Sequence, residues 1–170
     1  MDRKEILFTR RSIRQYKEGA MPKDELIEEL IHAAMCAPSA RNKQPWHFVI
    51  VKERENLKRL ADFHPYGKML NQAALAVLVC GDLQIDDSVN YLVQDCSAAT
   101  QNLLLAAHAS GLGAVWLGIF GRDERMAMMT EFFKLPSNIV PISLISIGYP
   151  AEEKAPNNNF NVQRLHFEQW

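Results

Sequence analysis

Apolar residues follow two different spacings along this chain, and each spacing predicts a different element. Between Pro22 and Pro38, apolar side chains from Leu26 to Met35 recur every three or four residues, which predicts an amphipathic helix that the second proline ends. The unbroken apolar runs at 46–51 and 75–80 are typical of strands that are buried on both faces. The chain interleaves helices with strands, so we expect a mixed layer of the α/β or α+β class.

Capping residues and apolar spacing also predict three shorter helices. Asp2 can cap a first helix that ends near Arg10, and further helices are expected at 54–63 and 124–133.

Two more strands and a tail complete the chain. The segments 114–117 and 139–147 are strand candidates, and Pro141 indicates that the second one is an edge strand or that the proline lies at its start. Residues 1–170 are expected to form a single domain in which 150–170 is an extended, docked tail. The apolar anchors of that tail are Val162, Leu165, Phe167 and Trp170.

The longest predicted helix runs from about Val89 to Ser110 and ends at Gly111. The stretch 96–121 contains no charged residue, so this helix is expected to be covered on most sides, by the sheet and by a second subunit. The stretch is not expected to span a membrane, because polar residues interrupt it and a span needs about 20 consecutive apolar residues. Those polar residues are Gln101, Asn102 and His108.

Composition narrows the function classes. The 170 residues contain 19 Lys plus Arg and 20 Asp plus Glu, a net charge of −1, which argues against binding to nucleic acid or to an anionic membrane surface. The cysteines Cys36, Cys80 and Cys96 are widely spaced, so we interpret them as buried thiols of a cytoplasmic protein and expect neither a disulfide nor a metal site. The first residues do not resemble a signal peptide.

Three arginines and a serine gather just past the first predicted helix, in the run Arg10-Arg11-Ser12-Ile13-Arg14. Guanidinium groups bind phosphate oxygens through two parallel hydrogen bonds, and a hydroxyl adds a short neutral donor. The run therefore suits a phosphate, while a solvated basic surface remains the plain alternative.

A second polar cluster lies in the loop 37–46, where Pro38 and Pro45 enclose amide and hydroxyl side chains able to read the edge of a heteroaromatic ring. An ordinary turn would give the same composition. Gly118 follows a strand candidate, so backbone there can approach a flat ligand closely. The glycines at 111, 113 and 118 do not form a dinucleotide fingerprint, because they follow a helix and lead into a strand.

Taken together, these segments resemble the FMN-dependent nitroreductase family. Four segments carry the resemblance in order, from about residue 5 to residue 155: Arg10 to Arg14, Ala37 to Trp46, Asp95 to Ala99 leading to Gly111-Leu112-Gly113, and Gly148-Tyr149-Pro150. The resemblance implies an α+β homodimer with a mixed β-sheet surrounded by helices and a long buried helix at the interface. It also implies two FMN sites between the subunits, reduced by NADH or NADPH.

The resemblance further implies roles for particular residues. Arg10, Ser12 and Arg14 would hold the FMN phosphate, with Arg11 beside them on the ribityl chain. Pro38, Ser39, Ala40 and Asn42 would come from the second subunit. Backbone groups of Trp116, Leu117 and Gly118 would lie near the reactive N5 of the flavin, and Lys68 would place a cation near its ring.

The function implied is an NAD(P)H-dependent oxidoreductase that reduces nitroaromatic, quinone or similar acceptors by a ping-pong mechanism, with no acid or base side chain identified. The alternatives are an FMN-binding relative with another task, such as reductive dehalogenation or flavin handling, and a non-enzymatic dimeric module that binds an anion. One departure concerns the tail. Where many relatives have a basic residue, this chain reads Asn157 to Asn159, and Arg164 is the candidate replacement.

Overall fold

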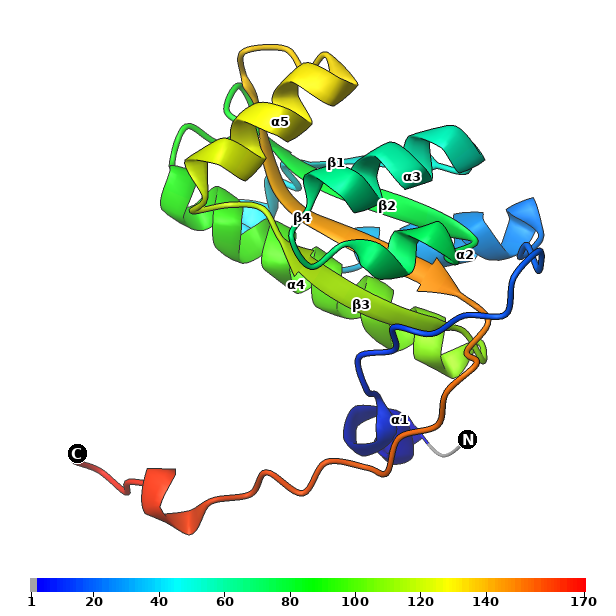
Figure 1. The fold of residues 1–170 in the computed structure, drawn as a ribbon. Helices are drawn as coiled ribbons and strands as arrows, with labels where there is room; N and C mark the ends of the chain where they lie inside the picture. Colours follow the sequence, from blue (N-terminus) through cyan, green and yellow to red (C-terminus); the bar gives the residue numbers. More distant parts are fainter. Residues whose placement is uncertain (1–2) are drawn as a thin grey trace.

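A four-stranded antiparallel sheet forms the middle layer of the fold (Figure 1). The computed structural model describes residues 3–170. The strand order is β1 (Trp46–Val51), β2 (Leu75–Asp82), β4 (Ile139–Gly148), β3 (Gly113–Gly118), so β1 and β3 are the edges. A parallel bridge between Ser12 and Ala114 adds to the outer side of β3. The sheet topology settles the class as α+β.

Helices cover both faces of this sheet. Buried side chains of α2 (Asp24–Met35) and α4 (Val89–Ala109) form one core with the sheet. Those of α3 (Arg54–Phe63) and α5 (Asp123–Phe133) form a second core on the opposite face. The short α1 (Arg3–Thr9) lies beside the end of α4, where Thr9 Oγ1 is 2.8 Å from His108 Nε2. The short 3₁₀ segments are η1 (Ala40–Asn42), η2 (Lys68–Asn71) and η3 (Val162–Arg164).

The two cores explain why β2 is apolar without alternation. Val77 and Val79 belong to the core beneath α2 and α4, whereas Ala76 and Leu78 belong to the core beneath α3 and α5. Every residue of β2 is buried, because adjacent side chains point to opposite faces and both faces are covered.

Pro141 does not mark an edge strand, because β4 lies between β2 and β3. Pro141 lies near the start of β4, as the second of the two predicted possibilities requires. There the pairing with β2 shifts register, since Val79 is opposite Ser143 while Cys80 is opposite Pro141. This irregularity accommodates a residue that has no N–H to donate.

The tail is extended, but its apolar anchors are exposed on this chain: 67% of Val162 and 85% of Phe167 remain accessible. Docking of the tail therefore stays a prediction that would require another surface. Cys36 is exposed, contrary to the expectation of a buried thiol, because it follows the last turn of α2. The cap proposed at Asp2 lies outside the described residues. No helix within 3–170 is long and apolar enough to cross a membrane.

Candidate functional site

The arginine-rich segment leaves α1 and lies along the free edge of β3. The Ile13 N–H donates to the Ala114 carbonyl at 3.0 Å, which fixes the segment against the strand. The buried Tyr16 hydroxyl donates to the Ile13 carbonyl at 2.8 Å. Gly113 permits this approach, because a Cβ there would lie 2.6 Å from Ile13 Cγ2. Arg10, Arg11 and Ser12 are half-buried, and Arg14 is exposed.

The start of the tail returns to the same segment. Glu152 Oε1 accepts hydrogen bonds from the backbone N–H groups of Arg14 at 2.5 Å and Gln15 at 3.3 Å. Lys154 Nζ lies 2.8 Å from the Ser12 carbonyl oxygen and 3.2 Å from Glu152 Oε1. These donors, the Arg14 N–H first, lower the pKa of Glu152. Arg11 donates to the Ala155 carbonyl, so the tail and the arginine segment are joined by both main-chain and side-chain contacts.

The free edge of β3 presents backbone hydrogen-bonding groups on alternate residues. The Ala114 carbonyl points outward to Ile13, so the N–H and C=O of Trp116 and Gly118 also face outward, while those of Leu117 face β4. From Ala114 to Gly118 is four residues, or about 13 Å at the usual strand rise. A ligand whose anionic end contacts the arginines can therefore reach outward-facing groups at Gly118 with its other end.

The Gly118 end of the edge is held by two donors. The Gly118 carbonyl accepts hydrogen bonds from Arg125 Nη1 at 2.9 Å and from His64 Nε2 at 3.3 Å. His64 Nδ1 accepts the Tyr66 N–H at 3.2 Å, so the proton of the neutral ring is assigned to Nε2. Burial lowers the pKa of His64 and favours this neutral form. A Cβ at Gly118 would meet nothing within 4 Å, which leaves open space over the Gly118 Cα.

Lys68 begins η2, four residues after His64, and its side chain is exposed. The segment is held by Arg54 of α3, whose guanidinium donates to three backbone carbonyls, including that of Ala73 at 2.7 Å. The Gly67 N–H also donates to the His64 carbonyl at 2.8 Å. Lys68 is thus placed by the same turn that contacts Gly118.

The predicted loop between α2 and β1 is strained. Arg41, Asn42 and Gln44 have φ values of 55°, 54° and 51°, in the left-handed region that side chains other than glycine rarely adopt. Each such residue costs about 1–3 kcal/mol, so surrounding contacts have to impose the conformation. Strain of this kind is concentrated at ligand-binding sites, which supports the prediction that this loop is functional.

Contacts from α4 and from the loop itself impose that conformation. The Ala40 N–H donates to both carboxylate oxygens of the buried Asp95, at 3.0 and 3.1 Å. Within the loop, the Gln44 N–H donates to Ser39 Oγ at 2.9 Å. Lys43 Nζ pairs with the buried Asp86 at 3.4 Å. These contacts leave the hydroxyl hydrogen of Ser39 free to be donated.

One chain does not bring the two clusters together. The 38–45 loop is tied to Asp95, and the arginine segment lies near His108, thirteen residues further along α4. At 1.5 Å per residue the two attachment points are about 20 Å apart. The loop residues Pro38, Ser39, Ala40 and Asn42 therefore lie far from the arginine end of the β3 edge in their own chain.

Several candidate residues had not been singled out individually: Lys154, His64, Arg125 and Asp95. Only Asp95 lies in a segment that carried the resemblance. Lys154 lies three positions before Asn157, where the segment without the expected basic residue begins, and only its contact with Ser12 indicates its role. Burial raises the pKa of Cys80 and of Cys96 to about 12. Both side chains therefore stay as unreactive thiols at neutral pH, and we assign them no chemical role.

The geometry and the sequence agree with one family. A model of the nitroreductase family matches residues 7–78 and 64–149, and the chain belongs to that family. The resemblance found in the sequence is thereby confirmed.

Individual relatives extend this result. A Methanothermobacter thermautotrophicus protein provisionally named NADH dehydrogenase/NAD(P)H nitroreductase is 44% identical over 170 residues, 100% of this chain and 88% of the relative. An FMN-dependent nitroreductase from Clostridium difficile R20291 superposes with a TM-score of 0.89 at 30% identity, over 97% of this chain and 98% of the other. The NADPH:FMN oxidoreductase from Vibrio harveyi, complexed with NAD⁺, gives a TM-score of 0.85 at 26% identity, over 98% and 76% respectively.

Proposed function

We propose that this protein is an FMN-dependent oxidoreductase that takes electrons from NADH or NADPH and passes them to nitroaromatic, quinone or similar acceptors. The observation that carries the proposal is the free edge of β3. It has an arginine segment at one end and outward-facing backbone groups about 13 Å away at Gly118. The names of the relatives, several of which refer to FMN or NAD(P)H, support the same reading.

The residues fit a bound FMN in the following way. Arg10, Ser12 and Arg14 would contact its phosphate, and Lys154 adds a cation beside Ser12 that the sequence had not suggested. The guanidinium of Arg11 donates to the tail, so its contact with the ribityl chain would use its remaining N–H groups.

At the other end of the edge, the outward N–H of Gly118 would donate toward the flavin N5, and Trp116 would border the ring. Leu117 would contribute through the peptide bond that it shares with Gly118. The exposed Lys68 would supply positive charge near the ring.

When bound, FMN supplies hydride chemistry, accepting reducing equivalents from the nicotinamide and releasing them to the acceptor. The protein's own contribution is orientation. Pairing with β4 directs the Gly118 N–H outward. His64 and Arg125 hold the Gly118 carbonyl of the next peptide unit, and the absence of a Cβ leaves room for a flat ring. Because one open face would serve both substrates in turn, we propose ping-pong kinetics.

The second half of the site would come from a second copy of the chain. In its own chain the Pro38–Asn42 loop is attached about 20 Å from the arginine end of the β3 edge, whereas a homodimer could supply it from the partner. The exposed apolar residues of the tail and the charge-free half of α4 are consistent with such an association.

Purification followed by an absorption spectrum tests the cofactor, since bound FMN gives a yellow protein. A colourless protein that also fails to bind added FMN would refute the proposal. Steady-state rates with both nicotinamides and a panel of quinones and nitroaromatics then test the reaction. Parallel double-reciprocal lines are expected, and intersecting lines would contradict the ping-pong order.

Light scattering tests the assembly. We expect a dimer at micromolar concentration whose interface buries more than about 2,000 Å², as obligate dimers do. A flavin-bound monomer would contradict the assignment of the Ser39 loop to a partner's site.

A further inference from the structure

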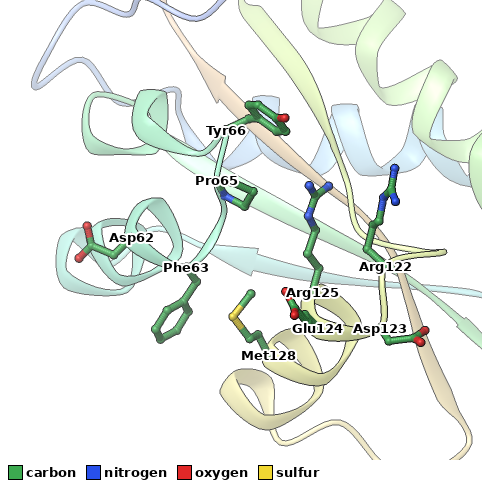
Figure 2. A pocket seen from close by; sticks show the side chains of 9 residues that line it. All are labelled: Asp62, Phe63, Pro65, Tyr66, Arg122, Asp123, Glu124, Arg125 and Met128. Carbon is green, nitrogen blue, oxygen red and sulfur yellow. The ribbon is translucent and has the colours of Figure 1, made fainter.

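A cavity of about 790 Å³ opens beside the Gly118 end of β3. It lies between the turn that follows α3 and the first turns of α5 (Figure 2). Arg125 and Met128 are spaced three residues apart, so they share one side of α5, and Tyr66 lies across the cavity from them. Arg122 lines the cavity from the position just before the first residue of α5. Phe63 and Pro65 complete the apolar part of the lining.

The two arginines face the cavity without acidic partners. Figure 2 shows both guanidinium groups directed toward the side where Tyr66 lies, while the carboxylates of Asp62 and Asp123 point away. Asp62, Asp123 and Glu124 also contribute to the lining of the cavity. Glu124 precedes Arg125 by one position, so its side chain leaves the helix about 100° away from that of Arg125. The ion pairs found among residues 3–170 involve neither arginine.

Arg125 is held in place before any ligand arrives. One of its N–H groups donates to the Gly118 carbonyl at 2.9 Å, and its guanidinium carbon lies 5.7 Å from the centre of the Tyr66 ring. A guanidinium has five N–H donors, so the others stay available to a ligand. Arg122 is exposed and adds a second positive charge on the same side. The cavity thus combines a cation held by a hydrogen bond, an exposed second cation and an aromatic surface.

We propose that Arg122 and Arg125 bind an anionic group, a phosphate or a carboxylate, of the substrate that reacts at the Gly118 end of β3. This inference rests on the proposed function. Tyr66 would pack against the planar part of the same molecule. The anionic group could belong to the electron donor, as the additional phosphate that distinguishes NADPH from NADH. It could instead belong to the acceptor, as an aromatic carboxylate.

The two half-reactions separate these sources. Using the FMN-loaded protein without oxygen, stopped-flow absorbance would follow flavin reduction by NADPH and by NADH, and then reoxidation by 4-nitrobenzoate and by the neutral 4-nitrobenzamide. The variants are Arg122→Gln, Arg125→Gln and the double variant, with Arg122→Lys and Arg125→Lys to restore charge. Lys58→Gln, on the exposed side of α3, is the control for loss of one surface charge.

In one of the two half-reactions, we expect the wild type to prefer the more anionic compound, NADPH over NADH or 4-nitrobenzoate over 4-nitrobenzamide. Each Arg→Gln change should raise the half-saturation constant of that compound about tenfold, as loss of one charge-assisted hydrogen bond would. For Arg122→Gln the constant for the neutral member should change little. Arg125→Gln also removes a bond to the Gly118 carbonyl, so its effect on the anionic member should exceed its effect on the neutral one. The lysine variants should recover part of the preference, and Lys58→Gln should behave as wild type. If the preference for the anionic compound is lost only in flavin reduction, the bound anionic group belongs to the nicotinamide. If the preference is lost only in flavin reoxidation, the group belongs to the acceptor.

Three results would overturn the proposal. One is a wild type without preference in either half-reaction. Another is a double variant that keeps the preference. The third is an equal loss for anionic and neutral partners, which would mean that Arg125 acts only by positioning Gly118. A wild type that binds FMN but is not reduced by any nicotinamide would instead refute the proposed function and this inference with it.

Discussion

Along β3, the groups that would meet a ligand belong to the backbone of a sheet edge, whereas in the 38–45 loop they belong to a segment held in a strained conformation. The edge is supported along its whole length by β4. The loop depends on a few contacts, above all on the two bonds between Ala40 and Asp95. Because of this difference, we expect the β3 edge to tolerate side-chain changes, whereas the 38–45 loop should change conformation when the buried Asp95 carboxylate is removed.

The largest effect is expected from Asp95→Ala. The substitution leaves the Ala40 N–H without its acceptor. Hydrogen bonds to charged groups contribute about 1.5–3 kcal/mol, so we expect a loss of this size in the free energy of unfolding, measured with urea. FMN affinity should fall as well. Asp87→Ala, an exposed neighbour, is the control, and equal stability of the two variants would show that Asp95 does not hold the loop.

A smaller effect is expected at the edge from Arg14→Ala. Its backbone contact to Glu152 survives the change, so only the side chain's bond to the phosphate is lost. We expect FMN binding to weaken by about 1.5 kcal/mol, the lower end for a charge-assisted bond because the side chain is exposed. Fluorescence titration measures this, with Lys17→Ala as the matched control. An unchanged dissociation constant would remove Arg14 from the site.

The tail gives a third comparison. Lys154→Ala should weaken FMN binding by about 1 kcal/mol, because it removes a cation beside Ser12 and leaves Glu152 uncompensated. With Lys154 present, Asn159→Arg should tighten FMN by less than about 1 kcal/mol, and any gain should shrink in high salt. If instead Arg164→Ala weakens FMN while Lys154→Ala does not, the basic contact comes from the end of the tail.

The smallest expected effect is a dependence of stability on pH, caused by two histidines near the β3 edge. Burial lowers the pKa of His64 and of His108, with Arg10 contributing to the second shift. A histidine whose pKa is lower in the folded state binds more protons when unfolded, so stability should fall as pH drops below about 6.5. Urea midpoints between pH 8 and pH 5.5 measure this. His64→Gln should flatten part of the dependence, and an unaltered slope would mean that His64 does not contribute.

The sequence predicted local structure well where periodicity and terminating residues agreed. β1 and α3 have the predicted limits, 46–51 and 54–63, and α4 ends one residue before the predicted Ser110. These elements depend on neighbouring residues, so a local pattern suffices. Family membership was also predictable, because it depends on several short segments in order.

Features that depend on distant contacts could not be predicted. Lys154 lies beside Ser12 although 142 positions separate them, and composition gives no sign of such a contact. The positive φ values at Arg41, Asn42 and Gln44 occur at residues that ordinarily avoid them, so only the surrounding contacts explain them. Pro141 suggested an edge because prolines are usual there, and the bulge that accommodates it involves a partner strand far away in sequence.

The separation between Ser12 and Lys154 also sets an order of events during synthesis. A ribosome that adds about 5–20 residues per second needs roughly 7–28 s to make the 142 residues between them. The arginine segment is made at the start of that interval, while the β3 edge and the start of the tail are made only toward its end. The nascent chain therefore cannot complete its cationic cluster until translation has passed residue 154.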